Sequence, residues 1–378
     1  MIRERPRAKA LRLLRARLAV AASAGQALAP ERLLAEEFEV SRTTIRWALA
    51  KLSIEGLIGP VVGRTRLVAD ATTRTTLASK AVYLFSSIAD ANGSHNIGWA
   101  GHVHNGAQQI LRDLGRNVLI LAGEIDAAMI TVLLHERPVG VLLVEPMYAG
   151  FSNQAVIDAA ARLSAAGIPA VAFGESELAC DRVYSDHVGG AQSLTSWLIS
   201  CGKRRHLHLW PGSPDQPWRE RRLAGHALAL AAAGLPRPVV ETVQWQGGVD
   251  DFERMEVILA GHLVPHLLGP EPIDAVVALI DAHVPVICAA LRRCGREPGC
   301  DVSVVGYDAN WIDSPERLRC LIPPAASIDK DNLGIGQAMA RLLEERIAGQ
   351  LPAEPQVRQV STLLVVSPPD KTREKTTI

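Results

Sequence analysis

Hydrophobic positions in residues 8–54 repeat at spacings of three and four, which is the period of amphipathic helices. The repeats predict three helices whose apolar positions are Leu11, Leu14 and Leu18, then Leu33, Leu34, Phe38 and Val40, and last Ile45, Leu49 and Leu52. Pro30 suits the first turn of the second helix, and Ser41 stands where the third helix needs an N-cap. Gly25 and Gly56 are expected to end the first and third helices.

A two-stranded wing is predicted directly after the third helix. Short apolar runs at 57–58 and 67–68 indicate two strands. Gly63, Arg64 and Arg66 lie between the runs and predict a tight basic turn. Three helices followed by such a hairpin make a winged helix-turn-helix domain.

From residue 80 onward, short apolar runs alternate with helical patterns. The runs are KAVYLFSS, NVLILAG, VGVLLVEP, IPAVAFG and DRVYSD and then, after a restart, RHLHLWPG, VVETVQW, AVVALI and DVSVVGYD. Helical patterns lie between them, as at 100–114, 154–166 and 219–233. Such alternation is typical of parallel sheets covered by helices. Two successive units predict two lobes with a ligand cleft outside the carboxyl ends of the strands.

Charge is distributed unevenly along a chain whose formal net charge is zero. Residues 1–79 contain 14 Lys and Arg against 7 Asp and Glu, so the remainder must hold 26 against 33. A small basic module joined to a larger acidic body suggests that the module meets phosphate and the body does not.

A cluster of hydroxyl and guanidinium groups opens the third helix. Arg42, Thr43, Thr44 and Arg46 lie in its first turns, on the faces that the apolar stripe leaves free. An arginine fork suits guanine, and hydroxyls at a helix N-terminus suit phosphate oxygens. The cluster therefore predicts a double-stranded DNA partner.

The stretch PERLLAEEFEVSRTTIRWALAKLSIEGLI, with the following GR, resembles the DNA-binding domain of the GntR family of bacterial transcription regulators. The resemblance implies DNA contacts from Arg32, Ser41, Arg42, Thr43, Thr44 and Arg46, and from Gly63 and Arg64 in the wing. One departure is visible, because Ala29-Pro30 replaces the usual proline-serine pair. The side-chain cap of the second helix should therefore be missing.

Four phrases of the body resemble the sugar-sensing domain of LacI-type repressors and periplasmic binding proteins: YSDHVGGAQSLTSWLISCGKRRHLHLWPG, RERRLAGHALALAAAGL, DVSVVGYDAN and IPPAASIDKDNLGIGQAMARLL. The resemblance implies that Asp186 and Arg222 reach into the cleft, with Asp308 after a strand. Paired hydrogen bonds from a carboxylate and a guanidinium suit vicinal hydroxyls. Trp99 and Trp218 are candidates for stacking on a sugar ring.

At some cleft positions this chain has other residues than the family pattern, so the effector of a family member cannot be assigned to this chain. Ile280-Asp281 stands where the family has asparagine-aspartate, and Asp281 is kept as a cleft candidate. Structural alternatives remain open for the others: a salt bridge within the lobe for Arg222, a loop cap for Asp308, and a core position for either tryptophan.

The remaining candidate chemistry is sparse. Six cysteines without a CxxC pair predict neither a disulfide framework nor a zinc site. His102 and His104, two positions apart on a helix, point to different faces, so no metal site is expected, and no cofactor is implied. The N-terminus has the outline of a secretory signal, but Arg12, Arg15 and Arg17 interrupt its apolar run. No apolar run of about 18 residues occurs, so a cytoplasmic protein without a membrane span is expected.

The predicted fold is an α+β winged helix-turn-helix domain followed by an α/β periplasmic-binding-protein-like domain with two Rossmann-like lobes. The predicted boundaries are 1–69 for the winged helix, 70–79 for a threonine-rich linker, 80–182 plus 325–347 for one lobe, 183–324 plus 348–368 for the other, and 369–378 for a polar tail.

The leading hypothesis for function is a homodimeric transcription regulator whose operator affinity is controlled by a small sugar. The two resemblances imply that it represses transcription. A constitutive repressor with a cleft that binds nothing is a second hypothesis. An enzyme fused to a DNA-binding head is a third, but the body has few lysines and no nucleophile elbow or HExxH motif. We therefore expect no catalysis.

Overall fold

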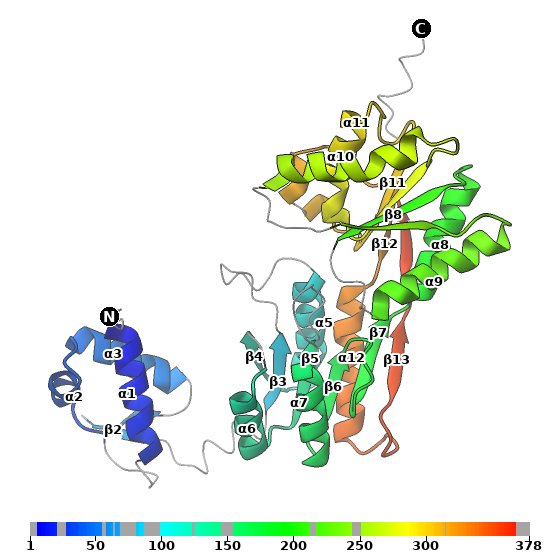
Figure 1. Ribbon diagram of the computed structural model, residues 1–378. Helices are drawn as coiled ribbons and strands as arrows, with labels where there is room; N and C mark the ends of the chain where they lie inside the picture. The colour runs from blue at the N-terminus through cyan, green and yellow to red at the C-terminus, as the bar shows by residue number, and fades with distance from the viewer. Residues whose placement is uncertain are drawn as a thin grey trace. The chain divides into compact units, whose positions relative to one another are not determined.

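The computed structural model of the chain describes residues 6–20, 28–54, 58–62, 65–68, 81–86, 99–122, 125–144, 154–211, 217–243, 251–313 and 315–367 (Figure 1). The chain divides into two compact units, Met1–Ala81 with Val132–Val139, and Val82–Thr131 with Gly140–Ile378.

The N-terminal segment forms the predicted winged helix. Its elements are α1 (Pro6–Val20), α2 (Glu31–Glu37), α3 (Arg42–Ile54), β1 (Ile58–Val62) and β2 (Thr65–Val68), with β1 and β2 antiparallel. Apolar side chains of the three helices meet in one core that includes Leu14, Leu34, Phe38, Ile45 and Leu49. The turn between the strands lies outside the described residues.

The helix caps follow the local sequence. The backbone N–H of Thr44 donates to Ser41 Oγ at 3.1 Å, which confirms the predicted N-cap of α3. Pro30 is itself the N-cap of α2, with ψ 146° and no side-chain cap, and Glu31 is the first helical residue. The missing cap is as predicted, whereas Pro30 lies one position earlier than the sequence suggested.

The first lobe of the body contains a six-stranded sheet in the order β13-β7-β6-β5-β3-β4. The strands are β3 (Ala81–Ser86), β4 (Asn117–Ala122), β5 (Gly140–Val144), β6 (Ala170–Phe173), β7 (Asp181–Ser185) and β13 (Val357–Val360). The associated helices are α5 (Trp99–Asp113), α6 (Ala127–Glu136), α7 (Gln154–Ala165) and α12 (Asn332–Ile347). Strands β3, β5, β6, β7 and β13 run parallel, and α5 and α12 cover one face.

The second lobe contains a six-stranded sheet in the order β14-β12-β11-β10-β8-β9. The strands are β8 (His206–Pro211), β9 (Val239–Val243), β10 (Ala275–Ala278), β11 (Ser303–Tyr307), β12 (Ala326–Asp329) and the antiparallel β14 (Leu363–Val366). The helices are α8 (His187–Ser200), α9 (Pro217–Ala232), α10 (Phe252–Leu268) and α11 (Val284–Arg293), with short 3-10 turns η2 (Asp281–His283), η3 (Trp311–Asp313) and η4 (Pro315–Leu318). Apolar cores on both faces confirm the predicted doubly wound fold.

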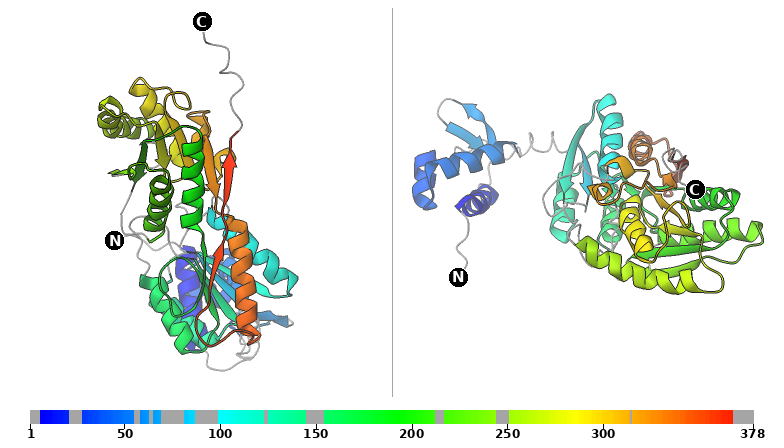
Figure 2. Two further views of the ribbon diagram at one scale, coloured as in Figure 1. Left: turned by 90° about the vertical axis from the view of Figure 1, so that its right-hand side faces the viewer. Right: turned by 90° about the horizontal axis from the view of Figure 1, so that it is seen from above.

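The predicted lobe boundaries are wrong where the chain crosses between the lobes. Strand β12 was assigned to the first lobe but pairs with β11 in the second, and β13 was assigned to the second but pairs with β7 in the first. Strand β7 also continues to Ser185 within the first lobe. Figure 2 shows β13 and β14 following one another from one lobe to the other. Four-residue strands carry no local signal that says which sheet they join.

Glycine permits close helix packing at the cleft side of the first lobe. A Cβ on Gly106 of α5 would lie 2.0 Å from the Leu333 carbonyl oxygen, and one on Gly336 of α12 would lie 1.9 Å from the Val103 carbonyl oxygen. Both distances are far inside van der Waals contact, so α5 and α12 approach as closely as they do only because these positions lack a side chain.

Candidate DNA-binding helix and effector cleft

Helix α3 presents a polar face at its N-terminal end. Arg42, Thr43 and Arg46 are exposed and Thr44 is half-buried, whereas Ile45 faces the core. The free backbone N–H groups and the helix dipole give this end a partial positive charge that favours phosphate oxygens. The arrangement leaves guanidinium and hydroxyl groups open to a partner.

Ion pairs on this face are weak and surface-exposed. Arg46 lies 3.2 Å from Glu31, and Arg32 lies 2.7 Å from Glu36. Arg42 makes no ion pair with any residue that the structure describes. Exposed pairs of this kind are worth about 0–1 kcal/mol, so phosphate can displace them at small cost.

More basic residues flank α3 through Trp47. The Arg7 guanidinium lies 4.9 Å from the centre of the indole ring, and the Lys51 ammonium lies 5.7 Å from it. Both distances are within cation–π range. The basic surface therefore extends beyond the predicted cluster to α1 and to the last turn of α3.

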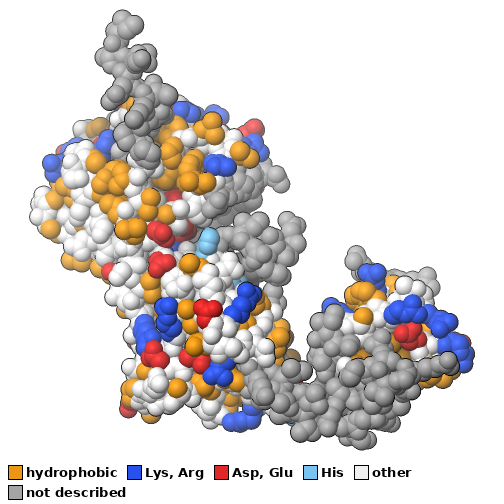
Figure 3. Space-filling view, turned by 180° about the vertical axis from the view of Figure 1, so that it is seen from behind, with side chains coloured by type: hydrophobic (Ala, Val, Ile, Leu, Met, Phe, Trp, Pro, Cys, Tyr) orange, Lys and Arg blue, Asp and Glu red, His pale blue; other side chains and the backbone are white. Residues whose placement is uncertain are grey.

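A pocket of about 210 Å3 lies between the two lobes of the body. It opens where β11 and β12 end, against the first turns of α5 and α12, as expected for the carboxyl ends of parallel strands. Its lining consists of His102, Asp308, Ala309, Asn310, Asp329, Asp331, Asn332 and Leu333. Figure 3 shows acidic side chains gathered at the junction of the lobes.

One residue of the pocket lining, Asp308, belongs to a buried ion pair. Asp308 Oδ1 lies 2.6 Å from Lys330 Nζ, and both side chains are buried. Burial lowers the pKa of Lys330, and the Asp308 carboxylate opposes this shift. Asp308 and Ala309 have positive φ angles of 93° and 49°, which is strained backbone for residues other than glycine.

Two amide oxygens of the pocket have no hydrogen-bond partner among the described residues. They are Oδ1 of Asn310 and Oδ1 of Asn332, and the Asn332 side chain is almost fully buried. A buried acceptor without a donor is unfavourable. The pocket therefore offers acceptors to a ligand that carries hydrogen-bond donors.

Asp281 supports this wall from behind. Its carboxyl group accepts the Ser327 hydroxyl at 2.8 Å and a backbone N–H from Asn310, while Ser327 Oγ accepts the Ala309 N–H at 3.1 Å. Burial raises the pKa of Asp281 to about 8, Ser327 lowers it, and the Asp308 charge raises it. Asp281 is thus largely protonated at neutral pH and fixes the loop rather than facing the pocket.

Arg222 is held in a separate buried cluster. Its guanidinium lies 3.8 Å from the centre of the Tyr307 ring and 4.7 Å from that of Trp218. One N–H donates to the Leu279 carbonyl oxygen at 2.9 Å, and Nε–H points at His187 Nδ1 at 3.4 Å.

Glu175 completes this cluster and determines the histidine tautomer. Arg221 Nε lies 2.6 Å from the Glu175 carboxylate, and His187 Nε2 lies 3.5 Å from it. Because Arg222 can only donate, His187 Nδ1 must accept, so the proton sits on Nε2 and faces Glu175. Burial raises the pKa of Glu175 to about 7 and holds the pKa of His187 well below its usual value.

Two family models match the chain. The model for bacterial regulatory proteins of the gntR family matches residues 8–68, and the model for the periplasmic binding protein-like domain matches residues 196–366. The chain joins a gntR-type module to a periplasmic-binding-protein-like domain. This architecture confirms both resemblances of the sequence.

Proteins of similar sequence and structure include transcription regulators. The HTH-type transcriptional regulator CelR of Thermobifida fusca is 33% identical over 193 residues, which is 50% of this chain and 53% of CelR. The aligned region thus spans about half the length of that relative. A solved CelR–cellobiose complex is 24% identical and superposes with a TM-score of 0.59 over 87% of this chain and 91% of that one. A LacI-family regulatory protein from Chloroflexus aggregans is 21% identical, with a TM-score of 0.60 over 76% and 98% of the two chains.

Within the periplasmic-binding-protein-like domain, the sequence-predicted residues occupy different environments. Asp308 lines the pocket, and Asp281 lies behind its wall. Arg222 and Trp218 belong to the buried cluster. Asp186 is the N-cap of α8, where Oδ1 accepts the Gly189 N–H at 2.8 Å. Their roles toward an effector stay predictions.

Some predicted residues lie outside the described part of the chain. Trp99 opens α5, but its side chain is not described, and Gly63 and Arg64 of the wing are outside the described residues. No statement about their contacts follows.

Several residues of the pocket and of the buried groups beside it escaped the sequence analysis. Lys330 and Asn332 follow β12 in the stretch DKDN, and polar residues directly after a predicted strand were the signal that could have found them. Glu175 follows β6 in the stretch FGES, and the sequence analysis gave it no role. His102 lines the pocket while His104 is buried, so the two do face different environments.

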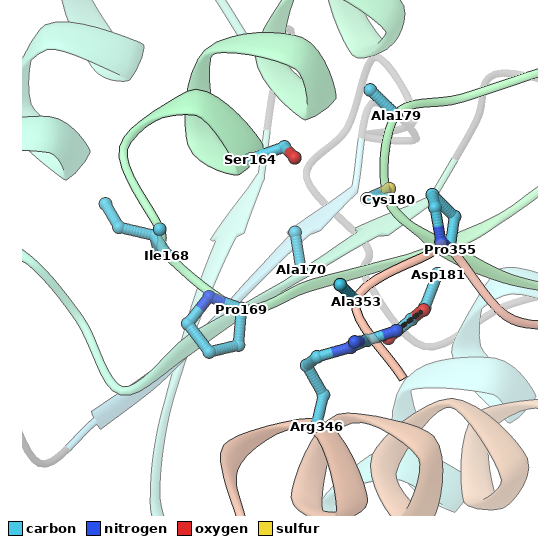
Figure 4. A pocket seen from close by; sticks show the side chains of 11 residues that line it. Ser164, Ile168, Pro169, Ala170, Ala179, Cys180, Asp181, Arg346, Ala353 and Pro355 are labelled. Atoms are coloured by element: carbon cyan, nitrogen blue, oxygen red, sulfur yellow. Dashed lines mark hydrogen bonds and ion pairs between the residues drawn. The ribbon is translucent and has the colours of Figure 1, made fainter. Parts of the chain in front are cut away.

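A second pocket, of about 320 Å3, lies at the amino ends of β6 and β7 (Figure 4). The charged residues in its lining, Arg346 and Asp181, are joined by two hydrogen bonds of 2.6 and 2.8 Å. Because Arg346 and Asp181 already pair with each other, we assign no ligand to this pocket.

Among the described residues, no three His, Cys, Asp or Glu side chains could hold a metal ion, and no helix could cross a membrane.

Proposed function

We propose that the protein is a sequence-specific DNA-binding transcription regulator whose operator affinity is controlled by a small molecule bound between the lobes of its body. The observation that carries this proposal is the exposed guanidinium and hydroxyl cluster at the start of α3 in a gntR-type module. Fusion to a sensor-type domain gives the module a means of control. Repression rather than activation rests on the family resemblance alone.

Helix α3 is proposed to enter the major groove of DNA. Arg42 and Arg46 would present forks to guanine edges or phosphates, and Thr43 would reach the backbone. The full set proposed to touch DNA is Arg32, Ser41, Arg42, Thr43, Thr44, Arg46, Gly63 and Arg64. Glu31 and Glu36 would release Arg46 and Arg32 on binding.

A sugar is the proposed effector. The pocket offers the carboxylate of Asp308 and the open amide oxygens of Asn310 and Asn332, and hydroxyl groups donate well to such acceptors. The cellobiose in the solved CelR complex makes cellobiose the first compound to test. A volume of about 210 Å3 favours a monosaccharide or one ring of a larger sugar.

A homodimer is the proposed form that binds DNA. One winged helix buries too little surface for strong specific binding, and a dimer on paired half-sites doubles it. The second lobe exposes apolar side chains in one segment: Ile312 is 72% exposed, Leu318 76% and Leu321 81%. Sedimentation of Leu321→Asp should show monomer if this segment forms the interface.

Effector binding is proposed to close the lobes and so to change operator affinity. The pocket wall comes from both lobes, with His102 on α5 and Asp308 after β11, so a bound sugar would hold them together. The change in operator affinity can be no larger than the difference in effector affinity between the two states.

Selection of operator DNA from a random library tests the DNA-binding role. Fluorescence anisotropy with the selected duplex should then show a loss of about 5- to 150-fold for Arg42→Ala, the cost of about 1–3 kcal/mol that one base contact carries. Arg112→Ala, an exposed arginine of α5, is the matched control and should bind like the natural protein. Failure to select any sequence would contradict the proposal.

A thermal-shift screen tests the sensor. Cellobiose, pentoses, hexoses, deoxy sugars, uronates and nucleosides would be compared on the natural protein and on Asn310→Ala and Asn332→Ala. A hit that the two variants lose would assign the pocket, and adding it should alter operator affinity. If no compound binds while DNA binding persists, the sugar proposal fails and a regulator with a non-sensing cleft is favoured.

A further inference from the structure

Trp47 of α3 holds two cations against its ring. The Arg7 guanidinium lies 4.9 Å from the ring centre, and the Lys51 ammonium lies 5.7 Å from it. Both cations are exposed, and neither forms an ion pair with any residue that the structure describes. An aromatic face restrains a cation without neutralising its charge. Arg7, Trp47 and Lys51, here called the Trp47 cluster, therefore keep two positive charges open to an anion.

The Trp47 cluster borders the polar face of α3. Thr43, Trp47 and Lys51 follow one another at four-residue intervals, so they lie along one side of the helix, away from the buried Ile45 and Leu49. The indole is half-buried because it also packs against the core of the winged helix. Its ring is thus fixed from below, next to the side chains already proposed to bind DNA.

A second group of cations borders the same face on its other side. Successive residues of a helix are about 100° apart, so Arg46 and Trp47 leave α3 on opposite sides of Thr43. Arg46 turns toward α2, where it lies 3.2 Å from Glu31, the neighbour of Arg32. Trp47 turns toward Arg7 of α1. The polar face therefore has cations along both of its edges.

The major groove presents phosphates in a matching arrangement. It is about 12 Å wide, which is close to the diameter of about 10–12 Å of a helix with its side chains. A helix that enters the groove consequently has one sugar-phosphate strand beside each of its edges.

We propose that Arg7 and Lys51, held in place by Trp47, bind phosphates of one DNA strand, opposite the strand that faces Arg32 and Arg46. This inference rests on the proposed function and adds three residues to it. Trp47 is a positioning residue, because it restrains the two cations and needs no contact with a base. Phosphates carry no sequence information, so the Trp47 cluster should strengthen binding to every duplex and fix the orientation of α3 in the groove.

The salt dependence of binding tests the two cations in the full chain. Arg7→Ala and Lys51→Ala should each reduce the slope of log affinity against log salt by about 1, for the selected operator and for an unrelated duplex alike. Arg17→Ala is the matched control, because Arg17 stands on the same helix as Arg7 and already pairs with Glu37. Its slope should equal that of the natural protein.

Operators with single neutral methylphosphonates locate the contacts within one half-site. The natural protein should lose affinity when particular phosphates of either strand are neutralised. Arg7→Ala should become insensitive to neutralisation on one strand only, and Arg32→Ala on the other strand only. Loss of sensitivity on the same strand in both variants would overturn the proposal.

Two substitutions of Trp47 separate its action on the cations from its packing. Trp47→Leu keeps an apolar contact with the core but offers no aromatic face, so its salt slope should fall as in the cation variants. Trp47→Phe restores an aromatic face and should restore the slope, while thermal melting shows both variants to be folded. A Trp47→Leu protein with the natural slope would overturn the positioning role.

Arg42→Ala on the same operator keeps this test distinct from that of the proposed function. Weaker binding by Arg42→Ala together with natural slopes for Arg7→Ala and Lys51→Ala would refute the Trp47 cluster alone. Failure to select any operator would refute both proposals.

Discussion

The charged side chains of α3 are exposed to water, whereas a charged pair in the body is buried. Arg46 keeps 65% of its side chain exposed although it faces Glu31, whereas Lys330 and Asp308 keep only 3% and 4%. Water solvates the first kind at all times, so it is free to exchange a carboxylate for a phosphate. The second kind has lost its water and depends on its protein partner.

In the N-terminal module, the charged side chains proposed to bind DNA therefore contribute little to the stability of the fold. In the body, the buried charged groups beside the pocket also stabilise the fold. Substitutions on the exposed face of α3 should change binding and leave stability unaffected. Substitutions among the buried groups of the body should change stability first.

Acid should destabilise the body most strongly. Burial lowers the pKa of five histidines: His187, His206, His208, His226 and His283. These histidines are neutral when folded and take up protons when unfolded, so their contribution is complete above pH 6.5 and is lost as the pH falls below it. A histidine that stays neutral in the folded state while it is protonated in the unfolded chain contributes at most about 1.4 kcal/mol per pH unit.

Two carboxyl groups oppose this trend, because the pKa of Glu175 is raised to about 7 and that of Asp281 to about 8. As the pH falls toward 4.5, they take up protons in the folded state before they do so in the unfolded chain, so they add to the free energy of unfolding.

His208→Phe isolates one histidine, whose pKa of about 3 lies far below the usual value. Urea unfolding between pH 6 and pH 5 should show a slope smaller by about 1.4 kcal/mol per pH unit; an unchanged slope would contradict neutral burial of His208.

Removing the cation of the buried pair should be the largest single effect at neutral pH. Lys330→Met leaves the Asp308 carboxylate buried without its counter-ion, and we expect a loss of about 3–5 kcal/mol in the free energy of unfolding. Adding Asp308→Asn should restore much of that loss. Arg293→Met, which breaks an exposed pair with Glu256, should cost no more than about 1 kcal/mol. Equal losses in the two single variants would show that the Lys330 pair is solvated.

Helix packing beside the pocket should be the next most sensitive feature. Gly336→Ala places a methyl group 1.9 Å from the Val103 carbonyl oxygen, and separating α5 from α12 should cost about 1–3 kcal/mol. Gly261 on α10 has no atom within 4 Å of the added carbon. Gly261→Ala should therefore be neutral or stabilising by up to about 1 kcal/mol. Thermal melting of both variants would be compared, and a stable Gly336→Ala would refute the close approach.

Caps in the N-terminal module should give the smallest effects on stability. Ser41→Ala removes the acceptor of the Thr44 N–H and should cost about 1 kcal/mol. Pro30→Ser offers α2 the side-chain cap that it lacks, and should add a similar amount. The two substitutions in one chain should nearly cancel in urea unfolding. A Pro30→Ser variant that is less stable would mean that the fixed φ of proline matters more than the missing cap.

The sequence was most informative where structure depends on near neighbours. The cap by Ser41 and the buried stripe of α3 involve residues within a few positions of one another, and both were predicted. Arg222 was expected in the cleft. Trp218 lies one turn before it on the same helix α9, whereas its other contacts, the Tyr307 ring on β11 and the Leu279 carbonyl after β10, come from distant parts of the chain. No local pattern specifies such a cluster.

The same reasoning explains the wrong lobe boundaries. Strands β12 and β13 are each four residues long, and either could pair with either sheet by composition. Strand β12 pairs with β11, the strand before it, whereas β13 pairs with β7, which lies far away in the chain, so only the folded arrangement decides the pairing.

The most direct test of the account compares Arg42→Ala with the natural protein. Selected operator DNA would be titrated with each protein at several salt concentrations, and the free energy of unfolding would be measured on the same preparations. We expect weaker binding, a slope of log affinity against log salt that is reduced by about 1, and an unchanged free energy of unfolding. An Arg42→Ala protein that binds with the natural affinity and slope would contradict the assignment of α3 as the DNA-reading element.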